Sequence, residues 1–440
     1  TPAPTAAQVA GAPAATPAPE KESGGERAAK QAEHKTPPMT MPPLSPAPDA
    51  QPEPKAEAKD EKDAKAEDKK SDEKKSDEKG LFDGFISAGS PALDAPGGIA
   101  AAAQVPATPL QLSGFVILNG QWIQEDPNYV YVGRTNGFSL SEARLEVTGR
   151  VTQSLWMFLS LDGAVQSRQG ADPSQGKNIV DLKDAYFVWE PITHLRIQGG
   201  QFKAPQDGEN LMEETEVRFP TRSIVTAGVN PPEGYTAVGL AVGRQVGLAV
   251  GTDQINFPYG WIAGQAMVSN GNGPNQLVND TKIPSFTGRV AAGFLSNHIN
   301  VGVDGYYQPR GTGTLQQYYR DDLYGFGADL TFNWGPAHVM GLVQSRLTKH
   351  VTAGSPDEQS LGFMAEAGWK FLGHIEPVIR FAQLDPSDLV PLAKVAQLDV
   401  GLNLYVKKYG RLSLAYVHRM EQTGRDLTND GLDLSLQVRF

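Results

Sequence analysis

The sequence has no cysteine among its 440 residues, which excludes disulfide bonds, thiolate metal sites and a cysteine nucleophile. It also has no run of about 18 consecutive apolar residues, which is the length that a membrane-spanning helix needs. The first residue is Thr1 rather than Met, and no export signal precedes the first polar stretch. We therefore expect the numbering to be that of a mature protein.

An excess of positive charge is also missing. The formal net charge is −11, divided as −5 in residues 1–110 and −6 in the remainder, so we expect no nucleic-acid partner. No glycine-rich phosphate loop or metal-ligand cluster is present, and neither His338 nor His418 has an evident serine partner. The sequence therefore predicts that the protein is not an enzyme and needs no cofactor or metal.

The last ten residues, GLDLSLQVRF, alternate strictly between apolar and polar side chains and end on Phe440. A period of two is typical of a strand with one apolar and one polar face. This pattern would suit a half-buried strand of a soluble sheet. An alternating strand that ends on an aromatic residue is also typical of bacterial outer-membrane β-barrels.

Similar alternating segments fill residues 111–440, and we count sixteen of them. They lie near residues 111–124, 138–151, 154–168, 179–190, 193–203, 243–252, 259–269, 283–293, 297–307, 320–334, 336–349, 360–372, 374–384, 394–407, 410–422 and 429–440. The connections between them alternate between short and long, as in an outer-membrane barrel with short periplasmic turns and long outer loops. The sequence thus predicts an all-β fold, a 16-stranded antiparallel transmembrane β-barrel with both ends in the periplasm.

The residues before the barrel have a different composition. Residues 1–80 are first rich in Pro and Ala and then in Lys, Glu and Asp, with the sequence KSDEK at both 70–74 and 75–79. We expect a disordered periplasmic tail, followed by a linker over 81–110. The tail could be a solvated spacer, or it could tether the barrel to peptidoglycan or a periplasmic partner.

One connection, residues 204–242, is far longer than the others. Long irregular loops in compact domains are usually functional, so we expect this third long loop to fold inward and constrict the lumen. The alternative is that residues 235–241 form an additional strand, which would change the strand count.

The sequence around this connection resembles the phosphate-selective porin O and P family. The resemblance covers residues 111–440 and is most specific at GGQFKAPQDGENL (199–211) and FPTRSIV (219–225), with further similarity at DLKDAYFVWEPITHLRIQGGQFK (181–203), RQVGLAVG (244–251) and VSNGNGPN (268–275). It implies a homotrimeric porin whose narrow lumen is lined by basic side chains.

Fixed positive charge along a lumen raises the local concentration of anions, and Lys and Arg replace their hydration. The candidates for an anion path are Lys203, Arg218 and Arg222 at the loop and Arg144, Arg196, Arg289, Arg346 and Arg380 on inward strand faces. The same parity places acidic residues inside, among them Glu142, Glu146, Asp162, Asp329, Glu366, Glu376 and Asp399. The basic residues could therefore form salt bridges instead.

We interpret the chain as an outer-membrane porin for passive diffusion of small hydrophilic solutes, with a possible preference for anions such as phosphate or polyphosphate. Its barrel would contact outer-membrane lipid and lipopolysaccharide. The alternative is a structural barrel that anchors the envelope through its periplasmic tail.

Overall fold

The computed structural model describes residues 109–440 except 168–176, 277, 314–317, 352–354, 408 and 423–425. The predicted tail over 1–80, and the predicted linker as far as residue 108, lie outside this described part. Among the described residues, no helix is long and apolar enough to cross a membrane.

β-Strands make up most of the described chain. The sheet strands are β1 (Leu110–Ile123), β2 (Gly137–Arg150), β3 (Leu155–Ser167), β4 (Lys177–Ile192), β5 (Leu195–Lys203), β8 (Arg244–Gly251), β9 (Ile255–Phe257), β10 (Gly260–Ser269), β11 (Ser285–Phe294), β12 (Ile299–Gly313), β13 (Tyr318–Trp334), β14 (Ala337–His350), β15 (Glu358–Trp369), β16 (Ile375–Asp385), β17 (Val395–Val406), β18 (Gly410–Glu421) and β19 (Gly431–Arg439). β8 and β9 both pair with β10 and together form one interrupted strand. The described sheet therefore has the predicted sixteen strands.

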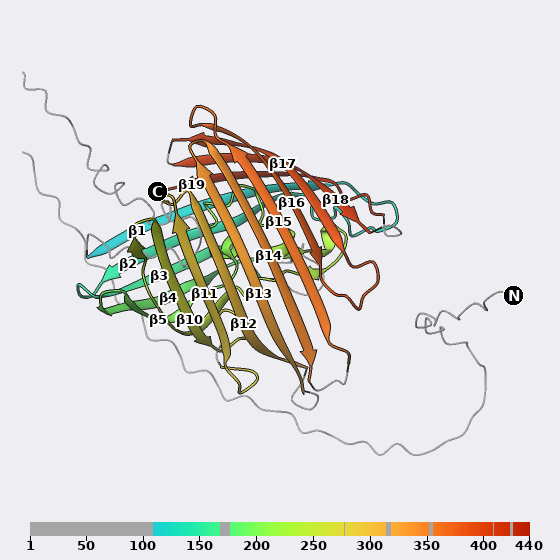
Figure 1. Cartoon of the computed structure of the whole chain (residues 1–440). Helices are drawn as coiled ribbons and strands as arrows, with labels where there is room; N and C mark the ends of the chain where they lie inside the picture. Colours follow the sequence, from blue (N-terminus) through green and yellow to red (C-terminus); the bar gives the residue numbers. More distant parts are fainter. Residues whose placement is uncertain are drawn as a thin grey trace, which may run out of the picture. The chain divides into compact units, whose positions relative to one another are not determined.

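The sheet closes on itself. β1 pairs with β2 on one side and with β19 on the other, where Phe115 lies opposite Arg439 and Ile123 lies opposite Gly431. Each strand between these pairs antiparallel with its neighbours, so the wall is a continuous ring of tilted strands (Figure 1). In the described sheet, closure pairs the first strand with the last and so removes the two edges that an open sheet would present to lipid. The predicted barrel is thus confirmed.

Burial along the strands follows the predicted alternation. In β17, Gln397, Asp399 and Asn403 are at most 4% exposed, whereas Val400 and Leu402 are at least 40% exposed. Polar side chains therefore face the interior and apolar side chains face outward. This arrangement is the reverse of a soluble barrel and matches an outer wall surrounded by hydrocarbon.

Short and long connections alternate around the ring as predicted, with one correction. Residues 308–319, predicted as a long loop, are largely strand, because β12 runs to Gly313 and β13 begins at Tyr318. Tyr and Thr favour strands, and a ladder that extends beyond the lipid needs no apolar outer face. Alternating hydrophobicity therefore underestimates the length of these two strands.

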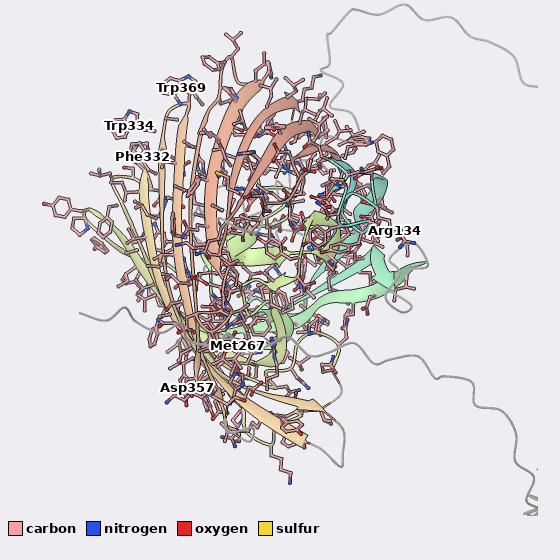
Figure 2. The ribbon with its side chains drawn as sticks, turned by 90° about the vertical axis from the view of Figure 1, so that its right-hand side faces the viewer. Arg134, Met267, Phe332, Trp334, Asp357 and Trp369 are labelled. Carbon is pink, nitrogen blue, oxygen red and sulfur yellow. The ribbon has the colours of Figure 1, made fainter. Side chains whose placement is uncertain are left out.

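Aromatic side chains lie on the outer wall near the strand ends. Trp334 and Trp369 are about half exposed and project from the same end of the wall, opposite the end that carries Asp357 (Figure 2). Trp189 and Phe440 are similarly exposed. This is the position of the aromatic girdles that meet the membrane–water interface.

Candidate functional site

The segment between β5 and β8, residues 204–243, has short elements of its own. They are α2 (Gly208–Leu211), α3 (Ile224–Ala227), β6 (Gly228–Val229), η2 (Pro231–Glu233) and β7 (Ala237–Val238). β7 has only two residues and pairs with β6 rather than with the barrel. The alternative of an additional barrel strand over 235–241 is therefore wrong. We call residues 204–243 the long segment.

The chain enters the long segment through a glycine pair in the sequence GGQFK. Gly200 has φ of 131°, and a Cβ there would lie 2.1 Å from the carbonyl oxygen of Ala185 on β4. A Cβ on Gly199 would lie 2.6 Å from the ring of Phe187. Both positions thus need glycine, because any side chain would push β5 away from β4.

An apolar anchor attaches the long segment to the barrel wall. Its residues Ile224, Val225, Val229 and Leu240 pack against inward-facing residues of β14 to β17, namely Met340, Leu342, Met364, Ala382, Leu384 and Val395. Val225 and Leu240 are at most 1% exposed. An apolar inner wall would be unfavourable against water, so this part of the barrel depends on its cover.

Arg380 on β16 is a polar attachment point for the same segment. Its Nε lies 2.7 Å from Asp399 Oδ2, and its Nη1 donates to the carbonyl oxygen of Thr221 at 2.9 Å. Nη1 also lies 3.6 Å from Glu209 Oε1, and the guanidinium stacks over the Phe219 ring. One buried arginine therefore joins the barrel wall to both halves of the long segment.

Asp207 organises the start of α2. Its Oδ1 accepts the N–H groups of Glu209 and Asn210, at 2.9 and 3.1 Å, and its Oδ2 accepts the Thr226 hydroxyl at 2.7 Å. Its own N–H donates to Asp304 Oδ2 on β12 at 3.1 Å. The Asp-Gly-Glu-Asn sequence therefore forms a helix cap that also contacts the wall.

Arg289 on β11 supports this contact from the wall. Its Nη1 lies 3.2 Å from Asp304 Oδ2 and 2.6 Å from Asp329 Oδ2. A Cβ at position 208 would lie 2.7 Å from the Asp329 carboxylate, so Gly208 allows the segment to approach the wall. Arg289 is thus enclosed by two carboxylates directly beneath the long segment.

Two of the predicted loop cations hold the segment together. Lys203 Nζ donates to the carbonyl oxygens of Asn210 and Met212, both at 2.7 Å. Arg222 Nη2 donates to the same Met212 oxygen at 2.7 Å and to Glu214 Oε1 at 2.9 Å. Both side chains therefore neutralise the carbonyl end of α2.

The other predicted cations are also partnered, as follows. Arg218 Nε lies 3.2 Å from Glu376 Oε1, Arg144 Nε lies 2.8 Å from Glu142 Oε2, and Arg346 donates to the Gly239 carbonyl and the Ser360 hydroxyl. Six of the eight candidates pair with carboxylates, namely Arg144, Arg196, Arg218, Arg222, Arg289 and Arg380. The candidates thus lie on the inner side of the barrel, and a neighbouring carboxylate neutralises the positive charge of most of them.

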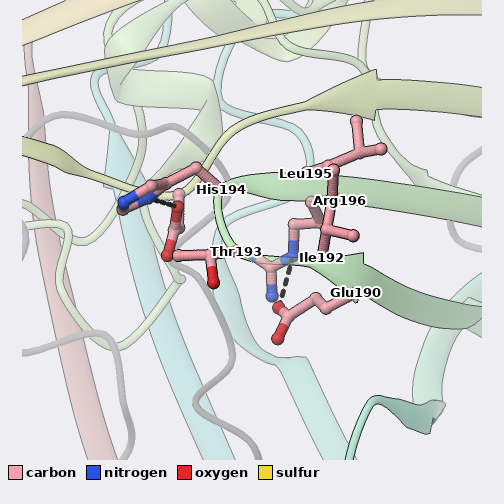
Figure 3. Close-up of a pocket in the computed structure, with 7 residues that line it drawn as sticks. Glu190, Ile192, Thr193, His194, Leu195 and Arg196 are labelled. Atoms are coloured by element: carbon pink, nitrogen blue, oxygen red, sulfur yellow. Dashed lines mark hydrogen bonds and ion pairs between the residues drawn. The ribbon is translucent and has the colours of Figure 1, made fainter.

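Arg196 lies apart from the long segment, at the turn that joins β4 to β5. It lines a pocket of about 230 Å³ and lies 3.5 Å from Glu190, while His194 pairs with Asp253 at 2.5 Å across the same pocket (Figure 3). Arg196 and His194 each have a carboxylate partner here. The pocket therefore offers no excess positive charge to an anion.

The alternation of inward and outward side chains along β18 could have identified one further inward-facing cation. Arg411 on β18 faces inward and is 6% exposed, and it lies opposite Tyr405 on β17. It was not among the candidates, although it shares the inward parity of Arg419 on the same strand. Within the described residues, no group of three His, Asp or Glu side chains could hold a metal ion.

A family model described as phosphate-selective porin O and P matches residues 119–311, from within β1 to within β12, including the whole long segment. Residues 119–311 are thus similar to the phosphate-selective porin O and P family. The match confirms the resemblance inferred from the sequence around GGQFK. No curated protein sequence matches the chain.

Solved porins share the fold. The anion-selective porin from Comamonas acidovorans is 16% identical, covers 75% of this chain with 99% of its own and has a TM-score of 0.52. The outer-membrane channel DcaP of Acinetobacter baumannii is 14% identical, with coverages of 75% and 97% and a TM-score of 0.50. Salmonella typhi OmpF, solved with daunomycin, is 12% identical, with the same coverages and a TM-score of 0.51. At these identities the likeness concerns the fold alone.

Proposed function

We propose that this protein is an outer-membrane porin that lets small hydrophilic solutes diffuse passively, with a preference for anions such as phosphate or polyphosphate. The observation that carries the proposal is a closed sixteen-stranded barrel with an apolar outer wall and a charged interior. The family description, phosphate-selective porin, supports the anion preference. Passive diffusion involves no covalent step.

The long segment sets the constriction in this proposal. Its partners come from strands around the ring: Asn119 on β1, Gln344 on β14, Arg380 on β16 and Gln437 on β19. Inward-facing side chains of well-separated strands can share one partner only if that partner lies within the lumen. These contacts support the proposal that the long segment lies across the lumen and narrows the passage.

The proposed orientation of the barrel in the membrane depends on which end of the ring carries the short turns. Leu110, at the start of β1, and Phe440 lie at the same end, because Gly114 and Phe440 exchange backbone hydrogen bonds. This end carries the short turns, which face the periplasm in outer-membrane barrels. We accordingly propose that the residues before Leu110 leave the barrel on the periplasmic side, where they could meet peptidoglycan or another partner.

A homotrimer is the assembly that the family resemblance implies, and we propose it for this chain. Light scattering of the purified protein in detergent, with the detergent mass subtracted, tests it directly. A mass of three 47.2 kDa chains is expected. A monomeric mass in several mild detergents would contradict the proposal.

Single-channel recording in a planar bilayer tests the proposed function. Stable conductance is expected, with reversal potentials in chloride and phosphate gradients that indicate anion preference and a chloride current that phosphate blocks. Conductance without anion preference would leave a general porin and reject the phosphate preference. Absence of conductance would favour the alternative, a structural barrel that anchors the envelope through its tail.

A further inference from the structure

Three cations converge on one tyrosine in the periplasmic half of the barrel interior. Lys370, which follows β15, has its Nζ 3.9 Å from the centre of the Tyr405 ring. Arg411 on β18 lies directly opposite Tyr405. Arg218 of the long segment reaches Glu376, whose other carboxylate oxygen accepts the Tyr405 hydroxyl. We call Arg218, Lys370, Tyr405 and Arg411 the periplasmic cluster.

The charge balance of this cluster differs from that of the other interior arginines. Arg289 and Arg380 each face two carboxylates, so those sites carry a net negative charge. The three cations of the periplasmic cluster share Glu376 and the more distant Glu366, which is 3.9 Å from Arg218. The cluster therefore keeps one formal positive charge.

Polar atoms beside the cluster are buried without a hydrogen-bond partner. They are Arg411 Nε, Asn403 Oδ1 and Ser413 Oγ, on side chains that are at most 6% exposed. Buried polar groups are almost always paired with protein, water or ligand. The Nε and hydroxyl groups are donors that suit an oxyanion, and Lys370 and Tyr405 are only partly buried.

We propose that the periplasmic cluster is a binding subsite for a small oxyanion such as phosphate, on the periplasmic side of the long segment. Arg411 offers a planar fork of donors and Lys370 a point charge, and Tyr405 holds the two side chains side by side. An anion that has passed the long segment reaches this excess positive charge before the short turns. The subsite rests on the proposed porin function and gives it a specific location.

Block of chloride current by inorganic phosphate tests the subsite in the full-length protein. Phosphate is added to each side of the bilayer in turn, to wild type, Arg411→Gln, Lys370→Gln and Arg411→Lys. Each Gln variant is expected to raise the half-blocking phosphate concentration roughly 10–100-fold, the loss expected for one charge-assisted hydrogen bond. The effect should be larger for phosphate added from the periplasmic side, and Arg411→Lys should retain part of the block.

Lys349→Gln is the matched control. Lys349 Nζ also lies over a tyrosine ring, at 5.5 Å from the centre of Tyr324, but at the other end of the barrel. Its removal should leave the phosphate block unchanged. Far-UV circular dichroism and thermal unfolding establish that each variant is folded, and partly exposed Lys370 provides the test if Arg411→Gln does not fold.

The outcomes separate this subsite from the function on which it rests. A conducting wild type whose phosphate block is equal in the Gln variants overturns the subsite and leaves the porin intact. An equal loss of block in Lys349→Gln also overturns it, since the effect would then be general. A wild type without conductance rejects the porin function and the subsite together.

Discussion

Arg380 illustrates why single interior residues of this barrel matter. Its side chain is buried among Asp399, Glu209 and Phe219, and it spans the barrel wall and the long segment. Two carboxylates in a low-dielectric interior are tolerated because this guanidinium lies between them. An interior ion pair of this kind fixes position more than it adds stability, because desolvation offsets much of the attraction.

Arg380→Gln should therefore be strongly destabilising. The substitution leaves Asp399 and Glu209 buried without their cation, which costs roughly 3–5 kcal/mol. Urea unfolding of the reconstituted protein measures the loss, with exposed Lys394→Gln as the control for a removed charge. Unfolding of Arg380→Gln at the wild-type urea concentration would contradict the ion pairs of Arg380 with Asp399 and Glu209.

The long segment is the element whose packing the sequence could not predict. Strand parity identified the inward arginines, because alternation depends only on neighbouring residues. It could not identify Asp304 as the acceptor of the Asp207 N–H, or the apolar inner residues Met340 and Met364 as a docking surface. Those contacts join residues about 100 positions apart and depend on which strands face each other across the ring. The composition of the segment, with five glutamates, concealed its apolar anchor.

Leu240→Ala tests this anchor. Leu240 is 1% exposed and packs in the cluster of Val225 and the inner wall, so its truncation should cost about 2–5 kcal/mol. A loosened segment should also increase the open-channel current noise in single-channel records. Leu402→Ala, at an exposed position on the outer face of β17, should change neither the noise nor the conductance. Quiet records from a folded Leu240→Ala protein would show that the anchor does not restrain the long segment.

Asp126 joins two long connections, the one between β1 and β2 and the one between β18 and β19. Its carboxylate accepts the N–H of Thr428 at 2.8 Å and that of Asn128 at 2.7 Å, and these backbone hydrogen bonds lower the pKa of Asp126 below its usual 3.8. A lowered pKa means that the folded state binds the proton less tightly than the unfolded state. This contribution to stability is present above about pH 4 and disappears as the pH falls through the lowered pKa.

Asp126→Asn should remove this acid sensitivity. The difference in thermal unfolding temperature between wild type and variant should be largest near pH 6 and should shrink as the pH falls to about 3. Because other carboxylates titrate equally in both proteins, the difference isolates Asp126. A difference that stays constant over this range would contradict the described contact between the loops.

At the scale of the whole molecule, the barrel residues combine a local positive cluster with a negative net charge. Residues 111–440 carry a formal charge of −6, and the interior arginines at Arg289 and Arg380 are each outnumbered by carboxylates. The long-range field of the barrel therefore opposes anions, whereas the periplasmic cluster attracts them at contact. These two effects have different ranges, so salt separates them.

The anion preference should accordingly increase with ionic strength. The screening length is about 10 Å at 0.1 M salt and about 3 Å at 1 M, so concentrated salt suppresses the acidic field while direct contacts at Arg411 and Lys370 persist. Reversal potentials measured at a fixed chloride gradient ratio, at mean concentrations of about 0.1 M and 1 M, give the comparison. In the Arg411→Gln/Lys370→Gln double variant this increase should be small. A preference that falls with salt would instead indicate a lumen with net positive charge along its length, and the pairing of arginines with carboxylates would then not govern ion selection.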